Sequence, residues 1–348
     1  MKKTFAMLIA LVMLLSLAAC GSTPAPASTP TPAGGAPAPA STPAGGSAEP
    51  AGQSFRVAIV QQLDHSSLDE IRLAIEAELD ALAADKGIGI SYTEFNGQND
   101  SSILNQIGAQ VVSDGYDAII PIATLAATCM VNAADGTDTP IIYAAISDPA
   151  EADLDGIDNV TGTSDALNTP FILDMMLAVD PDVQTVGLLD SNSEVNSVTP
   201  IAEAKAYLDG KGIKYIDKTG NTADEVISAV NSMLDQVDAV FTPTDNTVMS
   251  VAGAVGELLA GAGLPYYAGA DSFVTAGAFA TCGVNYTELG TYTAGMAVDI
   301  LLGGSVPEYH VMDGGIITVN TETAEAIGLD YSPFSDMAGT VLEVVTEG

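Results

Sequence analysis

Polar side chains of the kind that hold a small charged ligand recur along this chain, each time directly after a short apolar run. Thr124 follows IIPIA, Ser147 and Asp148 follow IIYAAI, and Asp245 and Asn246 follow AVFTPT. Hydroxyl and amide groups donate hydrogen bonds to a carboxylate, whereas Asp and Glu side chains accept them from an ammonium group. A site that combines both kinds of group suits a zwitterion such as an amino acid.

Other apolar runs are followed by similar residues, which complete the set of candidate ligand contacts. These further candidates are Gln61, His65, Glu194, Asn196 and Asp271. Two of them have an equally good simpler explanation. His65 fits a surface position at which a helix begins, and Glu194 could stay in solvent instead of lining a cleft.

Several candidates also stand where a helical pattern or a turn begins, so their side chains could simply cap it. We expect Thr124 to cap its helix and to bind a ligand carboxylate as well, together with the next backbone N–H groups. Ser147 is a second candidate donor to the carboxylate, whereas Asp148, before Pro149, could merely set a turn. Asp245 is the leading candidate for the ligand ammonium, because the neighbouring amide of Asn246 indicates a hydrogen-bonding rim rather than one cap.

Short β-branched runs alternate with helical patterns along the first half of the folded region. The first helix carries one apolar stripe, formed by Leu68, Ile71, Ile75, Leu79 and Leu82. Strands are expected over 56–60, 89–95, 118–122 and 141–145, with the other helices near 101–113 and 125–134. This order predicts a parallel sheet covered on both faces, and ligands bind at the carboxyl ends of the strands in such sheets.

The alternation restarts near Val186, which predicts a second lobe of similar size. Its strands are expected over 186–189, 214–216, 239–241 and 265–267, and its helices over 200–208, over 223–234 and up to about 260. A strand over 278–284 and a helix over 288–302 follow. We interpret both as the return of the chain to complete the first lobe.

The first twenty residues, MKKTFAMLIALVMLLSLAAC, have the pattern of a secretory signal peptide. Two lysines precede an apolar run that is too short to span a bilayer comfortably. The run ends in LAACG, which resembles the bacterial lipobox, so we predict that Cys20 carries acyl chains such as palmitate. An ordinary signal peptide with a chance cysteine is the alternative. Residues 21–53, rich in Pro, Ala, Ser, Thr and Gly, are expected to form a linker.

Composition excludes several classes of function. The formal net charge of −36 argues against a nucleic-acid partner. Only His65 and His310 are present, without CxxC or HxxH spacing, so neither a metal site nor a cofactor is expected. A GxSxG elbow is missing as well, and we expect no enzyme. Cys129 and Cys282 could form a disulfide or remain buried thiols.

A set of stretches distributed along the chain resembles the ABC-transporter substrate-binding lipoproteins of the tryptophan/tyrosine-binding type. In order, they are VAIVQQLDHSSLD, FNGQND, IIPIATLAA, AISDP, NVTGTSD, SEVNS, PTDNTV, AGADS and GVNYTELG. Ala270 departs from the pattern, since many relatives carry an acidic residue there. The resemblance implies a type I periplasmic binding protein of the α/β class, with two similar doubly wound parallel-sheet lobes that close on a ligand.

The resemblance also implies boundaries and partners. Lobe 1 is expected over 54–164 plus 283–314 and lobe 2 over 165–282 plus 315–348, with crossovers near 163–166, 281–283 and 313–315. The stretch NVTGTSD adds Thr163 to the candidate contacts. The implied function is capture of an amino acid, with aromatic L-amino acids expected, for an ABC permease and its ATPase. The protein is expected to be a monomer that its lipid holds on the outer side of the bacterial cell membrane. A lipoprotein that presents its ligand to a membrane receptor is the alternative.

Overall fold

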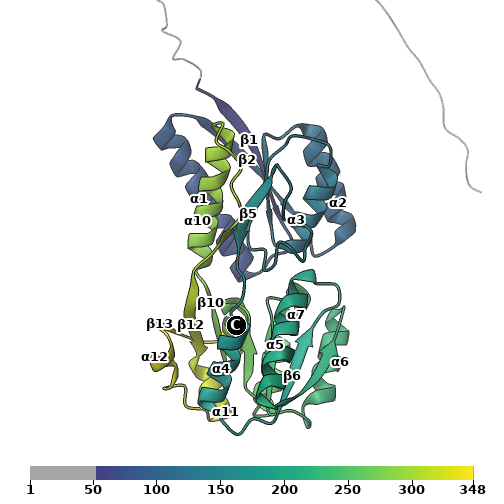
Figure 1. Cartoon of the computed structure of the whole chain (residues 1–348), viewed down its shortest axis with the longest axis vertical. Helices are drawn as coiled ribbons and strands as arrows, with labels where there is room; N and C mark the ends of the chain where they lie inside the picture. The colour runs from purple at the N-terminus through teal and green to yellow at the C-terminus, as the bar shows by residue number, and fades with distance from the viewer. Residues whose placement is uncertain (1–51, 348) are drawn as a thin grey trace, which may run out of the picture. The chain divides into compact units, whose positions relative to one another are not determined.

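The computed structural model describes residues 52–347, which form two β-sheets with helices packed on their faces (Figure 1). The predicted signal peptide, Cys20 and the linker up to residue 51 lie outside the described residues. Two α/β lobes were expected from the sequence, and the structure confirms this fold class. Cys129 and Cys282 are both buried and free.

The first sheet has six strands in the order β11-β5-β4-β3-β1-β2, and all neighbouring strands are parallel. They are β1 (Ser54–Gln61), β2 (Gly89–Asn96), β3 (Ala118–Ile122), β4 (Ile141–Tyr143), β5 (Val160–Ser164) and β11 (His310–Val311). The helices are α1 (Ser66–Lys86), α2 (Ser101–Asp114), α3 (Thr124–Ala133) and α10 (Tyr286–Leu301). Figure 1 shows α1 beside α10 on one face of this sheet and α2 beside α3 on the other.

The second sheet has seven strands in the order β13-β12-β10-β9-β8-β6-β7. They are β6 (Thr185–Asp190), β7 (Lys214–Thr219), β8 (Ala239–Thr242), β9 (Tyr266–Ala268), β10 (Ala280–Val284), β12 (Gly314–Asn320) and β13 (Thr340–Val344). The sequence predicted a parallel sheet here as well. The sheet is instead mixed, because β12 runs antiparallel to β10. The strand β10 also belongs here, and not to the first lobe, to which the sequence interpretation assigned it.

The helices of the second lobe surround this sheet. They are α4 (Thr169–Val179), α5 (Val198–Lys211), α6 (Ala223–Met233), α7 (Asn246–Met249), α8 (Ala252–Gly261), α9 (Asp271–Thr275), α11 (Thr321–Ile327) and α12 (Phe334–Met337). One continuous helix was predicted up to about residue 260, but the chain forms α7 and α8 with a break at Ser250 and Val251. A short 3₁₀ helix, η1 (Val195–Ser197), precedes α5.

The chain passes between the two lobes at three places: after β5, after β10 and between β11 and β12. The strand bounds place Gly283, Val284 and Gly314 in the second sheet, whereas the sequence interpretation assigned them to lobe 1. As lobe boundaries, the predicted ranges remain a proposal.

The apolar stripe of α1 explains how the first lobe holds together. Leu68, Ile71, Ile75 and Leu79 are buried, and Gly290 of α10 lies so close that an added Cβ would fall 2.5 Å from the Ile71 carbonyl oxygen. Burial of such side chains stabilises a fold by about 1.5–3 kcal/mol each. Within residues 52–347, no helix is both long and apolar enough to cross a bilayer.

Candidate ligand-binding site between the two sheets

A pocket lies at the carboxyl ends of strands from both sheets. The predicted residues that line it are His65, Thr124, Ser147, Asn196, Asp245 and Asn246. They follow β1, β3, β4, β6 and β8, so loops that are distant in the sequence meet around one space. This is the position at which α/β sheets bind ligands.

The N-terminus of α3 forms one wall of the pocket. Thr124 was expected to be the cap, but it is the first helical residue, and Ala123 occupies the cap position without a side-chain hydrogen bond. Among the described residues, the Thr124 hydroxyl has no hydrogen-bond partner, so it is available to a ligand. The next amide, Leu125 N, donates to Gln62 Oε1 at 3.0 Å. The helix therefore presents its first N–H group and a free hydroxyl to the pocket.

Two alanines that line the pocket have backbone conformations that favour glycine. Ala123 has φ 74° and Ala145 has φ 58°. Such conformations cost about 1–3 kcal/mol each, and they persist only where the surrounding structure enforces them. Here the Ala123 amide donates to the Ala144 carbonyl at 3.0 Å, which holds the turn that aims α3 at the pocket.

Asp165 supplies a buried carboxylate that was not among the predicted contacts. It follows β5, is 5% exposed, and accepts hydrogen bonds from the Ser147 hydroxyl at 3.1 Å and the Tyr286 hydroxyl at 3.4 Å. Ser147 gives its single proton to Asp165, so Thr244, whose oxygen lies 3.1 Å away, must donate to Ser147. Burial raises the pKa of the Asp165 carboxyl, and no Lys or Arg of the described residues lines the pocket to offset this.

Three buried polar atoms around the pocket have no hydrogen-bond partner among the described residues: His65 Nδ1, Asn196 Oδ1 and Ser272 Oγ. The orientation of Asn196 is set by its Nδ2, which donates to the Thr244 carbonyl at 2.7 Å and leaves Oδ1 as a free acceptor. Buried polar groups are normally satisfied, so these three atoms are available to hydrogen-bond a ligand. Leu68, Met249 and Phe273 add an apolar wall.

Comparison with known proteins fits this geometry. The family model described as ABC transporter substrate binding protein matches residues 56–333. The chain belongs to this family. Its members bind solutes outside the cytoplasm and are not enzymes.

Two relatives illustrate the match, and both are similar to this chain along most of its length. A protein named tyrosine-binding protein, from Clostridioides difficile strain R20291, is 30% identical over 280 residues, which cover 78% of this chain and 81% of that protein. A solved structure of an ABC domain in complex with L-Trp, from Streptococcus pneumonia, is 30% identical with a TM-score of 0.77 and covers 83% of this chain and 100% of its own.

A third relative was solved without ligand. The ligand-free, open structure of a Clostridium difficile substrate-binding protein with adhesive properties is 30% identical, with a TM-score of 0.64. The match covers 84% of this chain and 100% of that one.

In this substrate-binding protein, Asp245 is committed to holding its own lobe together. It is fully buried, caps α7 by accepting from Val248 N at 2.9 Å, and accepts from Ser191 N at 2.7 Å and from the Ser197 hydroxyl at 2.8 Å. A carboxylate offers about four lone pairs, so Asp245 has less capacity left for a ligand than Asp165. Its proposed contact with an ammonium group stays a prediction.

Glu194 and Asn246 tie the two lobes together beside the pocket. Glu194 is 4% exposed and accepts from Gln62 Nε2 at 3.3 Å and from Asn246 Nδ2 at 3.0 Å. Asn246 Oδ1 lies 3.2 Å from His65 Nε2 in the first lobe. Burial raises the pKa of the Glu194 carboxyl, and the nearby Asp245 carboxylate raises it further.

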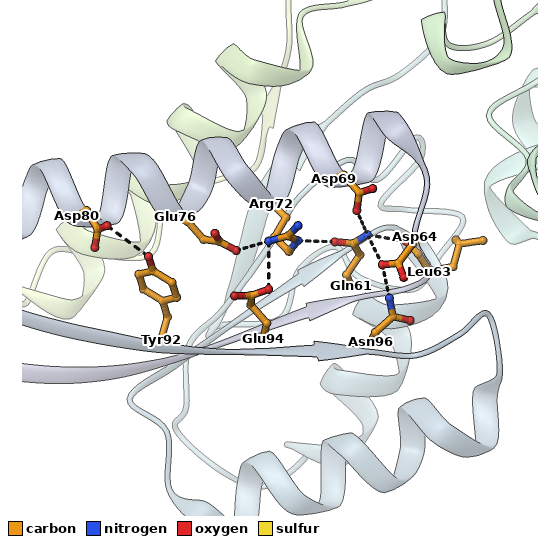
Figure 2. A network of polar contacts seen from close by, with 10 residues as sticks. All are labelled: Gln61, Leu63, Asp64, Asp69, Arg72, Glu76, Asp80, Tyr92, Glu94 and Asn96. Atoms are coloured by element: carbon orange, nitrogen blue, oxygen red, sulfur yellow. Dashed lines mark hydrogen bonds and ion pairs between the residues drawn. The ribbon is translucent and has the colours of Figure 1, made fainter. Parts of the chain in front are cut away.

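Gln61 does not line the pocket. Figure 2 shows it beside α1, where its Nε2 donates to Leu63 O at 2.7 Å and to Asp69 Oδ1 at 2.8 Å, while its Oε1 accepts from Arg72 Nε at 3.1 Å. Arg72 in turn reaches Glu76 and Glu94. This network anchors α1 to the edge of the first sheet.

The remaining candidates, Asp148, Thr163 and Asp271, also lie outside the pocket lining. Asp148 does set a turn, by accepting from two backbone amides at 3.1 Å each, and it accepts from Thr199 of the second lobe at 2.7 Å. This last bond is the largest contribution that lowers the pKa of Asp148. Asp271 accepts from Ser67 at 3.1 Å, and the Thr163 hydroxyl lies 2.8 Å from that of Thr293.

Asp165 was missed although a signal for it existed. Like the other candidates, Asp165 directly follows a strand, which here has the sequence VTGTS. That run was not assigned as a strand, because threonine, glycine and serine do not produce the continuous apolar pattern of a buried strand. Every residue of β5 is nevertheless buried.

Proposed function

We propose that this protein captures an L-amino acid, most suitably an aromatic one, for an ABC importer. The observation that carries the proposal is the pairing, in one pocket, of the open N-terminus of α3 with the buried and cation-free Asp165. The names of the relatives support an aromatic ligand, since one is called tyrosine-binding and another was solved with L-Trp.

The ligand carboxylate would bind at the N-terminus of α3. Thr124 offers its hydroxyl and its backbone N–H there, and the helix dipole favours negative charge. No basic side chain is required for this interaction, which agrees with a lining that contains no Lys or Arg among the described residues.

The ligand ammonium would bind between Asp165 and Asn196 Oδ1. Both lie on the polar wall that Ser147 and Thr244 join by hydrogen bonds. An ammonium group would supply the positive partner that the buried Asp165 carboxylate lacks. It would also donate a hydrogen bond to the unpartnered oxygen of Asn196. The apolar wall of Leu68, Met249 and Phe273 would then face the ligand side chain.

Capture would proceed by hinge closure. Side-chain hydrogen bonds join the lobes around the pocket, in the pairs Gln62–Glu194, His65–Asn246, Ser67–Asp271, Ser147–Thr244 and Asp148–Thr199. These contacts are short-range and polar, so they can break and re-form as the chain bends at its three crossovers. A monomer would deliver the ligand to a permease driven by an ATPase, while acyl chains on Cys20 hold it at the membrane.

Calorimetric titration against all twenty L-amino acids tests the ligand class. We expect one aromatic L-amino acid to bind in a one-to-one ratio to the chain from residue 52 onward, which contains both complete sheets. The matching amine without a carboxylate and the matching acid without an amine should bind at least about tenfold more weakly, since each leaves a buried partner unsatisfied. Silence across the whole panel would remove the amino-acid proposal.

A further inference from the structure

Gln62 joins three separate segments of the protein through a single side chain. It is fully buried and follows the last residue of β1. Its Oε1 accepts from Leu125 N, in the first turn of α3, at 3.0 Å. Its Nε2 donates to Asn99 Oδ1 at 2.8 Å and to Glu194 Oε1, in the second lobe, at 3.3 Å.

The chemistry of these partners fixes which way the amide points. A backbone N–H can only donate, so the Gln62 atom that faces Leu125 must be the oxygen. The nitrogen then faces Glu194, whose carboxylate accepts. The same side chain therefore needs an acceptor at the helix and a donor at the other lobe, which among the uncharged side chains of this length only glutamine provides.

Contact with the second lobe is thereby linked to the part of α3 that faces the pocket. Gln62 takes the Leu125 N–H and so leaves the preceding residue, Thr124, to present its own N–H and hydroxyl. Glu194 is held from its other side by Asn246, which returns to His65 in the first lobe. The amide plane of Gln62 is thus held from both lobes only when the lobes are in contact.

We propose that Gln62 is a positioning residue, which orients the N-terminus of α3 for the ligand carboxylate when the lobes close onto Glu194. The inference rests on the proposed function and deepens it. Gln62 need not touch the ligand. It acts through Leu125 on one side and through the contact with Glu194 on the other.

Exchange of the donor and the acceptor between the lobes gives a sharp test. Gln62→Glu keeps the size and the acceptor for Leu125, but two carboxylates then face each other. We expect about tenfold or greater loss of affinity at pH 9, above the Glu194 pKa of about 8, because both carboxyls are then ionised, a buried donor is lost and like charges meet. Glu194→Gln should also weaken binding, since its single amide oxygen can accept from Gln62 or from Asn246 but its NH₂ group then faces the other donor. The double variant should recover most of the lost affinity, because the new amide at position 194 can donate to the new carboxylate at position 62.

The probes are L-tryptophan and L-tyrosine, each compared with tryptamine or tyramine, which lack the carboxylate. A positioning role predicts that Gln62→Glu weakens the amino acid more than the amine, whereas general damage to the lobe would weaken both alike. Gln106→Glu, on the exposed face of α2, adds the same charge and should leave affinity unchanged.

The outcomes separate the two proposals. If the unaltered protein binds none of the twenty L-amino acids, the proposed function is wrong and the role of Gln62 falls with it. If the unaltered protein binds but Gln62→Glu keeps its affinity, or if the double variant is no better than Gln62→Glu alone, only the positioning role is overturned.

Discussion

At the scale of single residues, two buried aspartates in one pocket have different tasks because their hydrogen-bond partners differ. Asp245 accepts from two backbone amides and one hydroxyl, which stabilise its charge without any ligand. Asp165 accepts only from the hydroxyls of Ser147 and Tyr286 among the side chains described. The protein therefore stabilises the ionised form of Asp165 with fewer hydrogen bonds than that of Asp245. A cationic ligand group would stabilise the Asp165 carboxylate more.

Asp165→Asn is expected to weaken binding of the amino acid by about 2–5 kcal/mol, because the ammonium group would lose its buried counter-charge. The affinity of the unaltered protein should also fall on acidification. Burial raises the pKa of Asp165, binding of an ammonium group requires the ionised form, and protonation removes that form as the pH falls through its pKa. Calorimetry across a pH series measures both effects, and the variant should lose this pH dependence.

Asp245→Asn is the matched comparison. It should lower the free energy of unfolding by about 1–3 kcal/mol in urea titrations, since an amide cannot accept all three hydrogen bonds. The opposite result, in which Asp245→Asn abolishes binding at unchanged stability while Asp165→Asn binds normally, would return the ammonium site to Asp245.

At the scale of elements, the turn from β3 into α3 is strained so that the helix can point at the pocket. Ala123→Gly should raise the free energy of unfolding by about 1 kcal/mol, because relief of about 1–3 kcal/mol of strain exceeds the entropy that glycine adds to the unfolded chain. Ala126→Gly, inside the same helix, should instead lower it by about 0.5–1 kcal/mol. Equal losses in both variants, measured by urea denaturation, would show that Ala123 is unstrained.

The elements that could be predicted from the sequence were those with a clear pattern of apolar residues. The strand over 118–122 and the stripe of α1 follow directly from the apolar pattern, and the structure confirms them. The strand β5 was missed because VTGTS lacks that pattern, and Asp165 was missed with it. Capping was also misjudged at Thr124, since an alanine with positive φ at the cap position leaves no signal in the sequence. Burial of Gln62 by three distant partners is a tertiary effect that local sequence cannot report.

At the scale of the whole molecule, the proposed anchor separates a lipid-held protein from a freely diffusing one. Cys20→Ser should move the full chain from the membrane fraction to the soluble fraction of bacteria that express it, because a thioether-linked diacyl anchor can no longer form. Labelling with a clickable palmitate analogue should be lost in the same variant. Membrane association and label that persist in Cys20→Ser would show that another feature holds the protein at the membrane.

The first sheet takes its edge strand, β11, from residues 310–311, and α1 is covered by α10. During synthesis, α1 therefore lacks its partner α10 until residues 286–301 have left the ribosome. A nascent chain stopped at β10 would have the sheet side of the apolar stripe of α1 covered by β1 and β3 but would lack the contact with α10. The first lobe can therefore be completed only after most of the chain, up to residue 311, has been made.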